Sequence, residues 1–145
     1  MANACGPGED AMPECTARGT ARLFPMPTFR LGKTGFRFNA SHSFPNDAGY
    51  DRHLHGHDYE FTVMVEGERA PGAMLLDARQ LKRVVASEVI EKLDHANLDQ
   101  ILPDASLEAL AEWIWQALRP FVPAKLRLGL TVWETRSIYI EFWGT

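Results

Sequence analysis

Three of the chain's five histidines fall within the short segment DRHLHGHDYEF at residues 51–61. In an extended strand every second side chain points to the same face of the sheet. If the strand that contains Tyr59 reaches back through the H-G-H, then His55 and His57 project together and can bind one ion. His42, at the end of the preceding predicted strand, is the natural third ligand. Three imidazoles with one open coordination position form the usual catalytic zinc arrangement.

The residues alone leave other interpretations of these histidines open. An H-x-H pair in a soluble chain is more often surface polarity than a ligand pair. His53 shares the parity of His55 and His57, so a surface cluster of these three is conceivable. Such a cluster fits a tetrahedral ion poorly, because its ends lie about 13 Å apart along a strand, and His53 is better placed beside the site or in the loop. A cupin-type barrel also uses H-x-H, but it needs many short strands, whereas the middle of this chain is predicted to be helical.

The elements that must position the histidines follow from the periodicity of the sequence. Residues 1–27 are rich in Gly, Pro and small polar side chains, which predicts a flexible tail before one domain at residues 28–145. Partial alternation from Thr28 to about Phe44 predicts a strand with a bend or bulge at residues 33–35. Residues 59–68 alternate clearly, which predicts a half-buried strand.

Two helices and two further strands complete the predicted domain. Asp77 can cap a first helix with an apolar stripe from Ala78 to Leu93, and Ser106 can cap a second one that ends near Pro120. Alternation then predicts strands at residues 126–134 and 138–144. The order strand–strand–helix–helix–strand–strand predicts an α+β fold, in which helices cover one face of a four-stranded antiparallel sheet. Oligomerisation would hide the two sheet edges.

Composition excludes several classes of function. The net charge is −4 and the basic residues are scattered, so we expect no nucleic-acid partner. No apolar run approaches the length of a membrane span, and the N-terminus lacks the apolar core of a signal peptide. Only two cysteines occur, Cys5 and Cys15, both in the predicted tail. We therefore expect no disulfide framework and a cytoplasmic location.

Six segments carry a resemblance to a known family: FNASHSF, HLHGHDYEFTVMVEG, GAMLLDARQLKRVV, LDHANLDQ, ASLEALAEWIW and VWET. In this order they resemble the motifs of the 6-pyruvoyl-tetrahydropterin synthase family, which includes the 6-carboxy-tetrahydropterin synthases of queuosine biosynthesis. The resemblance covers about residues 29–143. Asp99 stands where the family's L-D-H-x-x-L-N motif has Asn, and Ser106 replaces the Thr of its T-x-E-N helix opening.

The resemblance implies the tunnelling fold, with two helices between the second and third strands of a four-stranded antiparallel sheet. Subunits would join edge to edge into a barrel, as a trimer or a hexamer. It implies zinc on His42, His55 and His57, and a pterin substrate held by Glu134 and Thr135. A carboxylate can accept two parallel hydrogen bonds from such a flat ring. Without the resemblance, Glu134 is more simply a solvated strand carboxylate.

The resemblance also implies that Asp94 and His95 form a proton-transfer pair, in which the acid orients and polarises the imidazole. From the residues alone, His95 is as well explained as a helix C-terminal histidine favoured by the dipole. Glu108 more simply stabilises the N-terminus of the second helix than binds substrate.

At one position the sequence departs from the family. Members that run the usual reaction carry a cysteine a few residues before the H-G-H as general base, whereas this chain has Asp51 there. A free thiol has a pKa of about 8.5 and a free aspartate about 3.9, so Asp51 is intrinsically the weaker base. Acidic residues at this place are associated with aldolase-type cleavage of the dihydroneopterin side chain to a hydroxymethyl-pterin.

We therefore predict a zinc-dependent lyase that acts on 7,8-dihydroneopterin triphosphate or a related dihydropterin. Asp51, Asp94 and His95 would move protons, and Arg52, Lys33 or Arg136 could meet a triphosphate. The alternatives are aldolase-type cleavage with Asp51 in place of Cys, and a non-catalytic protein that binds zinc and pterin.

Overall fold

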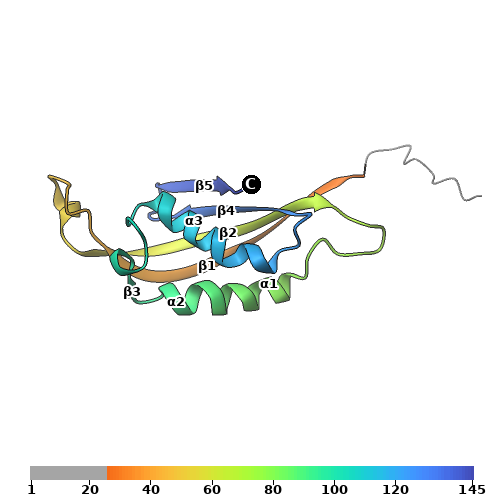
Figure 1. The fold of residues 1–145 in the computed structure, drawn as a ribbon, viewed down its shortest axis with the longest axis horizontal. Coiled ribbons are helices and arrows are strands. Elements are labelled where there is room, and N and C mark those ends of the chain that lie inside the picture. Colours follow the sequence, from red (N-terminus) through yellow and green to blue (C-terminus); the bar gives the residue numbers. More distant parts are fainter. Residues whose placement is uncertain (1–25) are drawn as a thin grey trace, which may run out of the picture.

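The computed structural model describes residues 26–145, and its strands form one five-stranded sheet in the order β3-β1-β2-β4-β5 (Figure 1). The predicted tail, with Cys5 and Cys15, lies outside the described residues except for Met26 and Pro27. Four strands pair with one another antiparallel, in the order β1 (Thr28–His42), β2 (His55–Glu68), β4 (Arg127–Trp133) and β5 (Tyr139–Trp143). The predicted extension of the second strand back through the H-G-H is confirmed.

The sequence predicted a four-stranded sheet, but the sheet has a fifth strand, β3 (Ala96–Asn97), which pairs in parallel with β1. The backbone N–H of His95 donates to the carbonyl of Asn39 over 2.6 Å, which brings the chain alongside the edge of β1. A two-residue strand has no periodicity to detect, and for this reason the sequence did not reveal it.

The predicted bend in the first strand is also confirmed. The pairing of β1 with β2 shifts register between Lys33 and Phe36, and Gly35 there has a φ of 78°. Glycine adopts this left-handed conformation without the steric penalty of a Cβ atom. The bulge re-aligns β1 so that Phe36, Phe38 and His42 point toward the helices.

Two helical segments cover one face of the sheet. The first comprises α1 (Ala78–Val85), the π-helical turn η2 (Ala86–Ile90) and α2 (Glu91–Leu93), where the sequence predicted one uninterrupted helix. The second is α3 (Leu107–Leu118). Both predicted caps are present, because Asp77 accepts from the N–H of Arg79 and Ser106 from that of Ala109. Short 3-10 turns occur at η1 (Tyr50–Arg52), η3 (Leu98–Gln100) and η4 (Arg119–Phe121).

A single apolar core lies between the helices and this face of the sheet. Stacked rings link the two long strands, with 5.2 Å between the ring centres of Phe36 and Phe61 and 5.1 Å between those of Phe38 and Tyr59. Burying each such side chain contributes about 1.5–3 kcal/mol. Among the described helices, none has the length and apolarity needed to cross a membrane. Figure 1 shows the chain between β1 and β2 projecting at one end of the molecule.

The cap of α3 offers a test of this architecture. Ser106→Ala should lower the free energy of unfolding by about 1 kcal/mol, because it leaves the N–H of Ala109 without its acceptor. Ser87→Ala, in the exposed part of η2, should change it by less than about 0.5 kcal/mol. Urea denaturation followed by circular dichroism measures both, and equal values for the two variants would contradict the capping role.

Candidate metal centre

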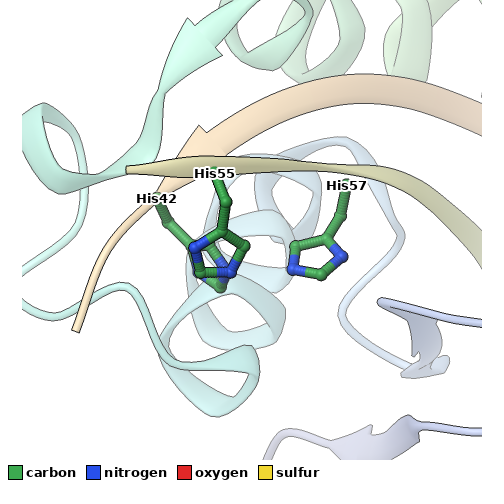
Figure 2. Close-up of side chains that lie close together, drawn as sticks. All are labelled: His42, His55 and His57. Carbon is green, nitrogen blue, oxygen red and sulfur yellow. The ribbon is translucent and has the colours of Figure 1, made fainter. Parts of the chain in front are cut away.

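The pairing of β1 with β2 brings the three predicted ligands together. His42 lies directly opposite His55, and Ala40 lies opposite His57, so the three imidazoles share the face that carries the core. Their ligand nitrogens all lie within 4.8 Å of one another, and the Nε2 atoms of His42 and His55 are 3.1 Å apart. Figure 2 shows the side chains leaving two adjacent strands toward a common point. The predicted triad is therefore present in the fold.

Backbone carbonyls fix the ring orientation of two of the imidazoles. Nδ1 of His42 lies 3.0 Å from the carbonyl oxygen of Ala105, and Nδ1 of His55 lies 2.7 Å from that of His53. A carbonyl only accepts hydrogen bonds, so both Nδ1 atoms carry the proton. The two Nε2 atoms, 3.1 Å apart, then face each other and can share a proton or bind one metal ion between them. The donor set thus fits a divalent metal of the zinc type, which binds neutral imidazole.

Burial supports the same protonation state at the third ring. Burial lowers the pKa of His57, and the nearby His42 and His55 act in the same direction, whereas the carboxylate of Glu134 opposes them. His42 is only 1% exposed. Neutral imidazoles at the end of an apolar core are the form that a metal ion requires.

Two carboxylates flank the triad from different elements. Oε1 of Glu134, which directly follows β4, lies 3.6 Å from Nε2 of His42 and 3.9 Å from Nε2 of His57. Oδ1 of Asp51, in η1, lies 3.9 Å from Nε2 of His55. Both residues were predicted site residues, and the fold places each beside a different part of the triad.

Tyr59 is a site residue that sequence reasoning missed, because its place in the alternation marked it only as core. It is 1% exposed, and its ring centre lies 5.8 Å from that of His57. Burial, the neighbouring carboxylates and a hydrogen bond to Glu134 together raise the pKa of Tyr59. The phenol therefore keeps its proton and can donate it to the carboxylate.

The loop that carries Asp51 is anchored at its base. The backbone N–H of Phe44 donates to the carbonyl of Asp51 over 2.8 Å. At Ser43, the residue before Phe44, the backbone N–H and the hydroxyl donate to the two carboxylate oxygens of Asp99 at 3.1 and 2.7 Å. The unusual Asp99 thus holds the end of β1 where the loop begins, a role that its sequence position did not reveal.

The Asp94–His95 pair lies at the edge of the sheet, beside β1. Oδ2 of Asp94 is 3.1 Å from Nδ1 of His95, and its Oδ1 accepts from the backbone N–H of Asn39 at 2.9 Å, the contact that mainly lowers the pKa of Asp94. Both residues border hollows lined by Asn39 and Asp58, and the hollow beside His95 is also lined by His57. The predicted pair therefore lies at the edge of the sheet, beside the strand that carries His42.

Thr135 and the three cations predicted to meet a phosphate lie at different distances from the triad. The hydroxyl of Thr135 accepts the N–H groups of Ser137 and Ile138, so it shapes the β4–β5 turn. Arg136 borders a hollow of about 400 Å³ beside Glu134 and Thr135. Lys33 lies at the bulge near Phe36, nine residues before His42 on β1, so it is remote from the triad within one chain. Arg52 donates to Nε2 of His53 next to Asp51.

Comparison with known proteins places these residues in a family context. The model of the 6-pyruvoyl tetrahydropterin synthase family matches residues 31–145. A dihydroneopterin monophosphate aldolase of Pyrococcus furiosus is 34% identical over 105 residues, which cover 72% of this chain and 89% of that protein. The human 6-pyruvoyl tetrahydrobiopterin synthase is 30% identical over 62% of this chain and 66% of its own length. The structure of the Caenorhabditis elegans synthase superposes with a TM-score of 0.71 at 24% identity, covering 85% of this chain and 100% of that one.

Zinc binding distinguishes the ligands from the neighbouring histidine. His55→Ala should reduce the zinc retained after dialysis from about one ion per chain to a small fraction, because two imidazoles seldom hold the ion alone. His53→Ala removes an adjacent imidazole outside the triad and should leave the zinc content unchanged. Atomic absorption on the purified variants measures this. Equal losses in the two variants would contradict the triad.

Proposed function

Because the chain belongs to the 6-pyruvoyl tetrahydropterin synthase family, whose members process pterins, we propose that it cleaves the side chain of a 7,8-dihydropterin in aldolase fashion. The products would be 6-hydroxymethyl-dihydropterin and a two-carbon aldehyde. The observation that carries the proposal is Asp51, whose carboxylate lies 3.9 Å from a triad imidazole at the place of the usual cysteine. The Pyrococcus furiosus aldolase, similar over most of its length, supports the same reaction.

Base strength favours the aldolase reaction over the synthase one. The synthase reaction starts with removal of a proton from carbon, for which a thiolate is well suited. Aldol cleavage starts with a hydroxyl proton, which is far more acidic, and more so near a divalent cation. An aspartate, whose ordinary pKa lies several units below that of a thiol, suits this second proton better.

The reaction balances without an external oxidant or reductant. Asp51 takes the proton from the hydroxyl of the second side-chain carbon, and the bond between the first and second carbons breaks. The second carbon leaves as the aldehyde carbon of the two-carbon product. The electron pair of the broken bond passes to the first carbon, which is conjugated with the C=N bond of the dihydropterin ring. Protonation of the first carbon gives the hydroxymethyl product and returns the base to its starting form.

The other residues hold the substrate for this step. Glu134 accepts the two N–H groups on the edge of the pterin ring, a bidentate contact that fixes the ring's orientation. Zinc on His42, His55 and His57 would supply Lewis-acid polarisation of the side-chain oxygens. Burial of the triad at the end of the core limits the access of water to these groups.

The Asp94–His95 pair points to an oligomeric enzyme. In one chain the pair lies at the edge of the sheet, and the His95 side chain is 79% exposed. Its exposure at an edge would allow the pair to serve the substrate of a second copy joined there. This agrees with a trimer or hexamer joined at the sheet edges, as the resemblance implies.

The synthase reaction is the second candidate function. It is favoured by the retained Asp94–His95 pair and by the similarity to the human synthase. In that case the pair, and not Asp51, would supply the base. A protein that binds zinc and pterin without turnover is the remaining alternative, and product analysis separates the three.

Product analysis tests the proposal directly. The zinc-loaded protein is incubated with 7,8-dihydroneopterin, its monophosphate and its triphosphate, and the products are identified by mass spectrometry. We expect 6-hydroxymethyl-dihydropterin with glycolaldehyde or its phosphate from at least one substrate. Release of triphosphate with a pyruvoyl or carboxy product would instead establish the synthase reaction, and no product from any substrate would leave only binding.

Substitutions at position 51 test the assigned base. Asp51→Asn should lower kcat/KM for cleavage by about 10²- to 10⁴-fold, because it removes the general base and keeps the shape of the side chain. Zinc content should not change. Asp47→Asn, in the same loop, is the matched control and should retain activity, since the Asp47 carboxylate accepts the N–H of Gly49 within the loop and an amide oxygen can do the same. Full activity of Asp51→Asn would show that another group is the base.

A further inference from the structure

The carboxylate of Glu134 lies beside two of the three imidazoles, a little beyond ligand spacing from each. In a tetrahedral zinc site with arms of about 2.0–2.1 Å, the ligand atoms are about 3.3 Å apart. The Nε2 atoms of His42 and His55 meet this spacing at 3.1 Å. Oε1 of Glu134 is 3.6 Å from the first of these nitrogens and 3.9 Å from Nε2 of His57. A shift of a few tenths of an ångström would bring it to ligand spacing from both.

We propose that Glu134 is an exchangeable fourth ligand of the metal, which it coordinates when no pterin is bound and releases when the ring arrives. This deepens the proposed function, since it rests on the zinc site and on Glu134 as the ring anchor. The Glu134 side chain is only 17% exposed, so solvent competes weakly for its charge. A cation bound to three neutral imidazoles attracts such a carboxylate strongly.

Glu134 cannot bind the metal and the pterin ring at the same time, because the two roles use the same carboxylate oxygen. A bidentate contact with the ring edge engages both carboxylate oxygens, whereas the metal requires one of them. Ring binding therefore withdraws Oε1 from the metal and opens a coordination position for the side-chain oxygens of the substrate. The metal becomes accessible only beside a correctly seated pterin, which adds ring recognition to the chemical step.

Tyr59 is the positioning residue of this device. It is buried in the core, two positions along β2 from His57, and burial together with the nearby charge of Glu134 raises the pKa of its hydroxyl, which therefore remains a donor. The ring also stacks on Phe38 with 5.1 Å between centres, so the hydroxyl has little freedom to move. A fixed donor of this kind holds the carboxylate toward the imidazoles and limits the rotamers that it can adopt.

Cobalt(II) in place of zinc makes the ligand set visible, because its visible absorption depends on the number and type of ligands. Glu134→Gln should change the band energies and intensities of the cobalt protein and weaken zinc binding by about 10- to 100-fold. Tyr59→Phe should produce a smaller change of the same kind. Glu141→Gln, a matched substitution of an exposed carboxylate on β5, should give the wild-type spectrum and affinity.

Unsubstituted pterin tests the exchange, because it has the ring edge but no side chain to reach the metal. Its addition should shift the wild-type cobalt spectrum toward that of Glu134→Gln and should leave that variant's spectrum nearly unchanged. Identical spectra for wild type and Glu134→Gln would overturn the proposed ligand. A wild-type spectrum that pterin leaves unaltered, although fluorescence shows pterin bound, would overturn the exchange.

These readouts separate the inference from the proposed function. Failure of the wild-type protein to bind cobalt or zinc would overturn the metal site and both proposals with it. Cobalt binding with a spectrum insensitive to Glu134 would overturn this inference alone, since turnover plays no part in the measurement. Circular dichroism of each variant establishes that the fold is intact, and Glu134→Asp, which shortens the arm by one methylene, repeats the spectral test if the glutamine variant does not fold.

Discussion

The register between β1 and β2 is the constraint on which the rest of this site depends. It sets His42 opposite His55 and, on the same face, places His57 one pair further along. A slip of one residue would turn every side chain of one strand to the other face and separate the imidazoles. The aromatic pairs between Phe36, Phe38 and their partners on β2 oppose such a slip, because it would expose rings that are now buried. The core therefore fixes the geometry of the metal ligands.

The three imidazoles lie between the apolar core and two carboxylates. Burial lowers the pKa of His57, and backbone carbonyls select the nitrogen that His42 and His55 each present. Asp51 and Glu134 then supply negative charge at two sides of the triad without occupying its buried interior. In the proposed exchange, release of Glu134 on pterin binding would leave part of the charge of a bound metal for a substrate oxygen.

Asp51 and Asp99 are two acidic residues at which this chain differs from the motifs that it resembles, and the fold brings them into one structural unit. Asp99, which replaces the usual Asn, binds both polar groups of Ser43 and so holds the base of the loop that carries Asp51. Figure 1 shows this loop projecting from one end of the molecule. If Asp51 is the base, as proposed, it needs such anchors, because the packed core that fixes the histidines does not extend to this loop.

The sequence by itself determined the elements and the ligand set of this protein. Alternation and the stripe of apolar residues located the long strands and both helical segments, the caps at Asp77 and Ser106 marked their starts, and the spacing of His42, His55 and His57 predicted the triad. These are local signals, readable over a few residues because strand and helix repeats are short. Only the tertiary structure decided the parallel strand at Ala96–Asn97, the contact of Tyr59 with Glu134, the distance from Glu134 to the imidazoles, and the sheet edge at which the Asp94–His95 pair lies. Each of these depends on how segments tens of residues apart meet across the sheet, and no local pattern encodes such a meeting.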